Sequence, residues 1–239
     1  MELQFTILDE TYKVPDHISL ECFARATVWN LDDLNNLKPF VATIMECPLY
    51  ALNRLDSEVL AFITGVCLQR FQLANQPVNS YVLDKWNLID FEEMTFAQFV
   101  DLDTFISTGV TSNIIEIAAC LYGAPRNLIK TCPIEHIWGA VVAYTEWREQ
   151  CYKEYDEFFE LETNREGPQP PSEGEEANIQ LMWWEAIMAL ANEDFLKIHQ
   201  VVERPWREAL NYLTWKKSQV QQQKLQQLKA KNDIQRRTK

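Results

Sequence analysis

The stretch LMWWEAIMALANEDFLKIHQVVERPWREALNYLTWKK, residues 181–217, decides the fold predicted for the C-terminal third of this chain. It holds four of the eight tryptophans, and its apolar residues recur at helical spacing. We predict a helix over 179–191, a short helix capped by Asn192, and a terminal helix that begins at Pro205, a residue favoured in a first helical turn. Together these elements predict a small helical module.

The charge of the chain divides near residue 200. Residues 201–239 carry ten Lys and Arg against three acids, a net charge of +7, which leaves −20 for the remainder because the whole chain carries −13. The two parts are therefore expected to contact different partners. After Lys217 the apolar residues follow no steady stripe, which predicts that the terminal helix protrudes from its module and is partly frayed.

The rest of the chain predicts a mainly α fold with a small N-terminal β-hairpin. Residues 3–7 alternate apolar and polar side chains, and a turn at 9–10 leads into a second alternating run. The spacing then becomes helical, with start signals such as Asp56 as an N-cap and a capping box, TFAQ, at 95–98. A long amphipathic helix is predicted over 134–161.

A polar span separates the predicted domains. Residues 163–176, TNREGPQPPSEGEE, contain three prolines and two glycines and therefore cannot form a core element. We predict an acidic, mainly helical domain with the N-terminal hairpin over 1–162, a flexible linker over 163–176, and a Trp-rich helical module with a basic tail over 177–239.

The side-chain chemistry predicts no catalytic residue, cofactor site or metal site. The three histidines form no HExxH pair, and the six glycines never cluster as a phosphate-binding loop does. Glu92-Glu93 and the pair Asp101 and Asp103 are interpreted as solvated faces, because neighbouring acids point away from each other on a helix. The six cysteines are interpreted as reduced, buried thiols. An enzyme whose site assembles only in the folded chain remains an alternative.

The tryptophans of the C-terminal module are predicted to contribute to partner binding. A three-helix unit of about sixty residues is too small to bury four indoles comfortably. Adjacent tryptophans on a helix face different directions, so one can fill the core while another anchors a contact with the large domain or a partner. The candidates are Trp183, Trp184, Trp206 and Trp215.

The basic residues of the terminal helix complete the predicted partner-binding site. Three interpretations stay open: a solvated helix end, docking to an acidic protein surface, and phosphate contacts with nucleic acid, which the acidity of the whole chain disfavours. The candidates are Lys216, Lys217, Lys224, Lys229, Arg236 and Arg237.

No part of the sequence predicts a membrane segment or a secretion signal. No window approaches the roughly 20 apolar residues that cross a bilayer. The N-terminus MELQFTILDE is acidic and has no basic stretch followed by an apolar run. The expected location is the cytoplasm, with no membrane partner.

Two segments resemble proteins that assemble bacteriophage tails. Residues 181–231 contain a Trp-bearing helix, a short helix, and a helix with a Lys/Gln-rich tail. This pattern resembles the C-terminal part of tail-assembly chaperones and related small morphogenesis proteins of tailed bacteriophages. MTFAQFVDLDTFI, residues 94–106, and the later helix ending CLYG at 120–123 resemble a further segment of such proteins.

The resemblance implies a non-enzymatic, chaperone-like adaptor in bacteriophage tail assembly. Its partner would be a phage structural protein, such as a tail-tube or tape-measure protein, in the cytoplasm of an infected bacterium. The chain is longer than the small members of this family, which leaves room for a structural subunit retained in the virion as an alternative. Self-association into a homo-oligomer is left open.

Overall fold

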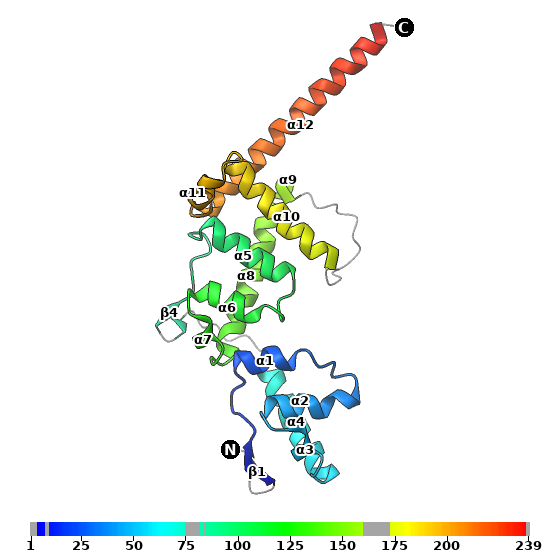
Figure 1. Ribbon diagram of the computed structural model, residues 1–239, viewed down its shortest axis with the longest axis vertical. Helices are drawn as coiled ribbons and strands as arrows, with labels where there is room; N and C mark the ends of the chain where they lie inside the picture. The colour runs from blue at the N-terminus through cyan, green and yellow to red at the C-terminus, as the bar shows by residue number, and fades with distance from the viewer. Residues whose placement is uncertain (1–3, 8–9, 75–81, 84, 160–172, 238–239) are drawn as a thin grey trace. The chain divides into compact units, whose positions relative to one another are not determined.

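The computed structural model describes residues 4–7, 10–74, 82–83, 85–159 and 173–237. Helices predominate among them, which confirms the mainly α fold (Figure 1). Contacts divide the chain into two compact units. Unit 1 comprises residues 1–89 and 109–145, and unit 2 comprises residues 90–108 and 146–239.

Unit 1 begins with the predicted hairpin. Strand β1 (Gln4–Ile7) pairs antiparallel with β2 (Glu10–Lys13), so that Gln4 lies opposite Lys13 and Ile7 opposite Glu10. A second, smaller hairpin joins β3 (Val82–Leu83) to β4 (Trp86–Asn87). Its strands have two residues each, which is too short for alternation to identify a strand from the sequence.

The helices of unit 1 surround an aromatic core. Phe71 stacks on Phe23 at 5.1 Å between ring centroids and meets Phe40 edge-on at 5.3 Å. Both geometries are favourable for aromatic pairs. The elements are α1 (Leu20–Ala26), η1 (Leu34–Asn36), α2 (Leu37–Ile44), α3 (Leu49–Leu52), α4 (Ser57–Ala74), α6 (Ile114–Tyr122), α7 (Arg126–Ile129) and α8 (Glu135–Glu154) up to Thr145.

Four cysteines are buried thiols: Cys22, Cys47, Cys67 and Cys151. Burial raises the pKa of Cys22 to about 11 and the pKa values of Cys67 and Cys151 to about 12. A thiol must lose its proton to become a strong nucleophile, so these groups are inert at neutral pH. They belong to the packing of the core, as the sequence predicts, whereas Cys120 and Cys132, predicted to be buried as well, are only half-buried.

The regular elements longer than a single bridge in the described part of unit 2 are all helices. These are α5 (Phe96–Ser107), the end of α8, α9 (Asp156–Phe159), α10 (Glu173–Leu190), η2 (Phe195–Lys197), α11 (Ile198–Val202) and α12 (Trp206–Arg237). The predicted capping box starts α5, where the Thr95 hydroxyl accepts from the Gln98 N–H and the Gln98 side chain accepts from the Thr95 N–H. The helix predicted over 134–161 is α8 followed by α9.

One predicted helix cap is wrong. Asn192 and Glu193 have left-handed backbones, with φ of 57° and 61°, and they turn the chain after α10. Asp194 caps the next helix instead, because its carboxylate accepts from the Leu196 N–H at 3.0 Å. Asn and Asp both serve as caps, but asparagine also tolerates the left-handed conformation that ends helices.

Residues on both sides of the predicted linker share the core of unit 2. Trp206 of α12 stacks on Phe99 of α5 at 5.2 Å and meets Trp147 of α8 edge-on at 5.0 Å. Trp183 of α10 also meets Phe99 edge-on, at 5.7 Å. This grouping differs from the predicted module of residues 177–239, because two buried indoles need more cover than α10, α11 and α12 provide.

The predicted linker itself falls mostly outside the described residues. Residues 163–172 are not described, and the last four residues of the span, Glu173–Glu176, form the start of α10.

Backbone hydrogen bonds join the segment before α12 directly to the start of α5. Phe96 N–H donates to the Arg204 carbonyl at 2.7 Å, and Trp206 N–H donates to the Met94 carbonyl at 3.2 Å. The first turns of α5 and α12 therefore lie side by side.

Candidate protein-binding surface

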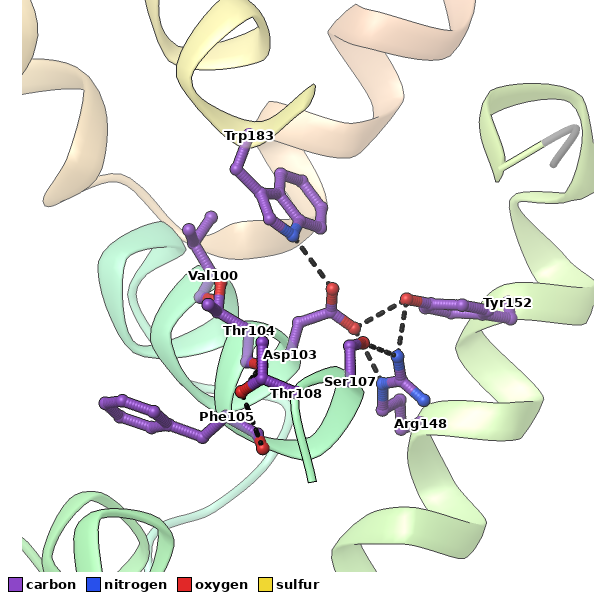
Figure 2. Close-up of polar contacts among 9 residues, drawn as sticks. All are labelled: Val100, Asp103, Thr104, Phe105, Ser107, Thr108, Arg148, Tyr152 and Trp183. Atoms are coloured by element: carbon purple, nitrogen blue, oxygen red, sulfur yellow. Dashed lines mark hydrogen bonds and ion pairs between the residues drawn. The ribbon is translucent and has the colours of Figure 1, made fainter. Parts of the chain in front are cut away.

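A buried polar cluster in unit 2 fixes the position of Trp183 (Figure 2). The Trp183 indole N–H donates to one carboxylate oxygen of Asp103 at 2.8 Å. The other oxygen accepts from Arg148 Nε and from the Tyr152 hydroxyl, each at 2.6 Å. Arg148 also donates to the Ser107 hydroxyl at 2.7 Å. The cluster thus joins α5, α8 and α10.

This cluster stabilises the fold and offers no open position for a ligand. A buried carboxylate is costly unless it is paired and hydrogen-bonded, and both oxygens of Asp103 are engaged. Burial, with the nearby carboxylate of Asp103, raises the pKa of Tyr152 well above its ordinary value. The phenol therefore stays protonated and remains a hydrogen-bond donor to Asp103.

The interpretation of Asp103 as part of a solvated face is wrong. Asp103 is fully buried, whereas Asp101, two residues earlier on α5, is exposed. The two acids do point away from each other, as their spacing predicts. The sequence carries no local sign of the partners of Asp103, because Arg148 and Trp183 are 45 and 80 residues away.

Trp183 and Trp206 are core residues, which corrects their prediction as partner-binding residues. Both side chains are almost completely buried. The Trp206 indole N–H donates to the Phe91 carbonyl at 2.9 Å, so its polar edge is also engaged within unit 2. Burial of the whole indole leaves no surface for a partner to contact.

Trp184 and Trp215, in contrast, are exposed. The exposed fraction is 49% for Trp184 on α10 and 56% for Trp215 on α12. Leu181 lies one turn before Trp184 and is also exposed. On α12, the ring centroids of Tyr212 and Trp215 lie 5.6 Å apart. Exposed aromatic side chains of this kind are enriched among the anchors of protein interfaces.

The predicted basic residues divide into two groups. Lys216 and Lys217 are half-buried and donate to backbone carbonyls of unit 2, at Ala189 (3.1 Å) and Phe158 (3.2 Å). These carbonyls lie at the C-terminal ends of α10 and α9, where a cation is favourable. Lys216 and Lys217 therefore have a structural role that the sequence does not indicate.

The other predicted basic residues lie on the distal part of α12, defined here as residues 218–237. Lys224 and Lys229 are exposed, whereas the side chains of Arg236 and Arg237 lie outside the described residues, although both belong to the helix. All side chains at 220–229 are exposed, including Val220, Leu225 and Leu228. In Figure 1 this segment, orange to red, extends away from α9 and α10 of its own unit.

Phe195 and Leu196 form an exposed apolar pair that the sequence-based interpretation missed. Phe195 is 71% and Leu196 83% exposed. Both lie on η2, whose position is set by the Asp194 cap. The residues before them, Asn192, Glu193 and Asp194, are of types that favour a turn and a capped short helix, and they are the sequence signal for this segment.

Comparison with known proteins assigns no family to this chain. No protein-family model, curated protein or solved structure matches it. Among the described residues, no group of three or more His, Cys, Asp or Glu side chains could hold a metal ion. The described helices likewise include none with the length and apolar character needed to span a bilayer.

Proposed function

We propose that this protein is a non-enzymatic protein-binding adaptor that uses the distal part of α12 and the nearby exposed aromatic residues. The observation that carries the proposal is the exposure of every side chain at 220–229 on a helix that continues to Arg237. A helix without tertiary contacts is marginally stable in water, because helices gain most of their stability from packing. A partner surface would supply that packing.

The charge of the segment indicates the kind of partner. Residues 218–239 carry six Lys and Arg against a single aspartate. Two such segments repel each other, so pairing between the tails of two copies is disfavoured, whereas an acidic protein surface attracts them. Trp215 and Tyr212 lie at the base of the segment and supply aromatic anchors.

The biological setting of the proposal is the assembly of bacteriophage tails. It rests on the resemblance of residues 94–106 and 181–231 to tail-assembly chaperones and related morphogenesis proteins. In that setting the partner is a structural protein of the tail, and binding takes place in the cytoplasm of the infected bacterium. A virion subunit is the alternative, and the two differ in whether the chain is found in purified particles.

Affinity capture from infected cells tests the proposal. The full chain, a chain that ends at Lys217, and a Trp184→Ala, Trp215→Ala variant are compared, and captured proteins are identified by mass spectrometry. We expect the full chain to recover a tail protein, and the other two to recover at least tenfold less, as roughly 1.4 kcal/mol of lost binding energy would produce. Equal recovery by all three chains would contradict the proposed surface.

A further inference from the structure

The base of α12, defined here as residues 206–217, is packed into unit 2. Trp206, Leu210 and Leu213 are buried, residues 216–219 are half-buried, and all side chains at 220–229 are exposed. The change from packed to exposed therefore takes about one helical turn. Among the described residues, the last hydrogen bonds between α12 and other helices of unit 2 are those of residues 216–218.

One side of this base lies along the end of α8 and α9. Three hydrogen bonds make the contact: Arg207 Nη1 to the Glu154 carboxylate (2.8 Å), the Tyr155 hydroxyl to Asn211 Oδ1 (3.0 Å), and the Ser218 hydroxyl to the Glu157 carboxylate (3.1 Å). Successive residues of an α-helix are rotated by about 100°, so residues 207, 211 and 218 lie within roughly 40° of one another around the axis. These three contacts therefore follow a single stripe of α12.

Lys216 and Lys217 hold the helix at other positions around its axis. Lys216 is nine residues beyond Arg207, which places it roughly 180° around the helix. Its ammonium donates to the Ala189 carbonyl of α10 at 3.1 Å, and the ammonium of Lys217 donates to the Phe158 carbonyl of α9 at 3.2 Å. Both carbonyls belong to the last turn of a helix, where the helix itself offers no N–H partner and a cation is favourable. The base is thus held from two sides by separate helices.

The two lysines therefore affect the orientation of distal α12. A helix held along one stripe can tilt about that stripe, whereas a contact on the opposite side resists the tilt. We infer that Lys216 and Lys217 are positioning residues that fix the direction in which distal α12 leaves unit 2. A helix already held in its bound direction loses less freedom when a partner docks, which favours binding. This inference rests on the proposed function, because a fixed direction matters only when one partner contacts distal α12 and the exposed residues of unit 2 together.

The distance between two spin labels, measured by pulsed electron paramagnetic resonance on the full chain alone, tests this inference. The labels are attached at Gln150→Cys on α8 and at Gln226→Cys on distal α12, both exposed positions. Cys120 and Cys132, which are half-buried, are replaced with serine in every variant so that they take no label. We expect a single narrow distribution of distances.

Three variants assign the direction to the two lysines. K216M/K217M removes both ammonium groups but keeps unbranched side chains that favour a helix, and the distribution is expected to widen by at least about twofold because both hydrogen bonds are lost. K216R/K217R keeps charged donors and is expected to keep the narrow distribution. K224M/K229M removes two exposed lysines of the same helix and is the matched control, expected to leave the distribution unchanged.

An unchanged distribution in K216M/K217M, or an equal widening in K224M/K229M, would overturn the inference. Circular dichroism checks that each variant is folded. If the double variant is unfolded, the single variants K216M and K217M are measured instead, and an unchanged distribution in both would likewise overturn the inference.

The result for the two lysines is separate from the result for the proposed function. If K216M/K217M widens the distribution but the full chain captures no virion protein from infected cells, the positioning role stands and the proposed function fails. If the distribution is unchanged while the chain ending at Lys217 loses its tail partner, the positioning role fails and the adaptor function stands.

Discussion

Replacing Trp183 with alanine is expected to destabilise unit 2 far more than the same change at its neighbour Trp184. Trp183 has 1% of its surface exposed, and removing a buried aromatic side chain costs about 3 to 5 kcal/mol. The change also removes the 2.8 Å hydrogen bond to Asp103, and a buried acceptor left without its donor costs about 1 to 3 kcal/mol more. Trp184 is 49% exposed, so Trp184→Ala should stay within about 0.5 kcal/mol of the wild type.

The measurement is urea-induced unfolding followed by circular dichroism, with the free energy of unfolding compared among the variants. The loss in Trp183→Ala approaches the total stability of an ordinary domain, so Trp183→Phe provides a milder test. Phenylalanine keeps an aromatic ring but lacks the N–H group, and the expected cost is about 1 to 3 kcal/mol. Equal effects at both tryptophans, or no cost in Trp183→Phe, would refute the role assigned to the Asp103 cluster.

Three further predictions concern the tail, an ion pair and the thiols. Ending the chain at Lys217 should change the free energy of unfolding by less than about 0.5 kcal/mol, and loss of the cooperative transition would show the tail to be structural. Arg207 of α12 forms an ion pair with Glu92, with 2.6 Å between its Nε and a carboxylate oxygen, and this hydrogen bond lowers the pKa of Glu92. The stability that the pair adds is therefore full above the unfolded pKa of Glu92 and is lost as the pH falls through the lowered folded pKa. Glu92→Gln should therefore cost less than about 1 kcal/mol at pH 7 and progressively less below pH ~4, with Glu93→Gln as the control; a cost that does not change with pH would contradict this. The four buried cysteines should react with a maleimide only after unfolding, and rapid labelling of any of these four in the native protein, located by peptide mass spectrometry, would contradict their burial; the half-buried Cys120 and Cys132 are the comparison.

Local signals in the sequence predict the elements of this fold well. The hairpin at the N-terminus, the capping box at Thr95 and the start of the terminal helix beside Pro205 each depend on a few neighbouring residues. Such features depend on backbone geometry and on hydrogen bonds between neighbouring residues. Particular residue types at fixed spacings in the sequence therefore indicate them. Whether Asn192 begins or ends a helix is harder to predict, because asparagine is common both at the N-cap and, in the left-handed conformation, just after the last turn of a helix.

The arrangement of unit 2 depends on contacts that no local pattern contains. In the sequence, nothing distinguishes Asp103 from other acids on helices. Only the folded chain brings it into hydrogen bonds with Arg148, Tyr152 and Trp183. Likewise, spacing alone predicts that Trp183 and Trp184 face different ways, but α5 and α8 determine which of the two is buried. The candidate surface could therefore be placed in the right segment from the sequence, while half of its tryptophans belong to the core.

Hydrogen exchange of distal α12, with and without the partner recovered by affinity capture, tests the central claim most directly. The amides of residues 220–229 should exchange rapidly in the protein alone, because all side chains of this segment are exposed, and at least tenfold more slowly in the complex. Unchanged exchange in this segment, with protection confined to other parts of the chain, would contradict the account.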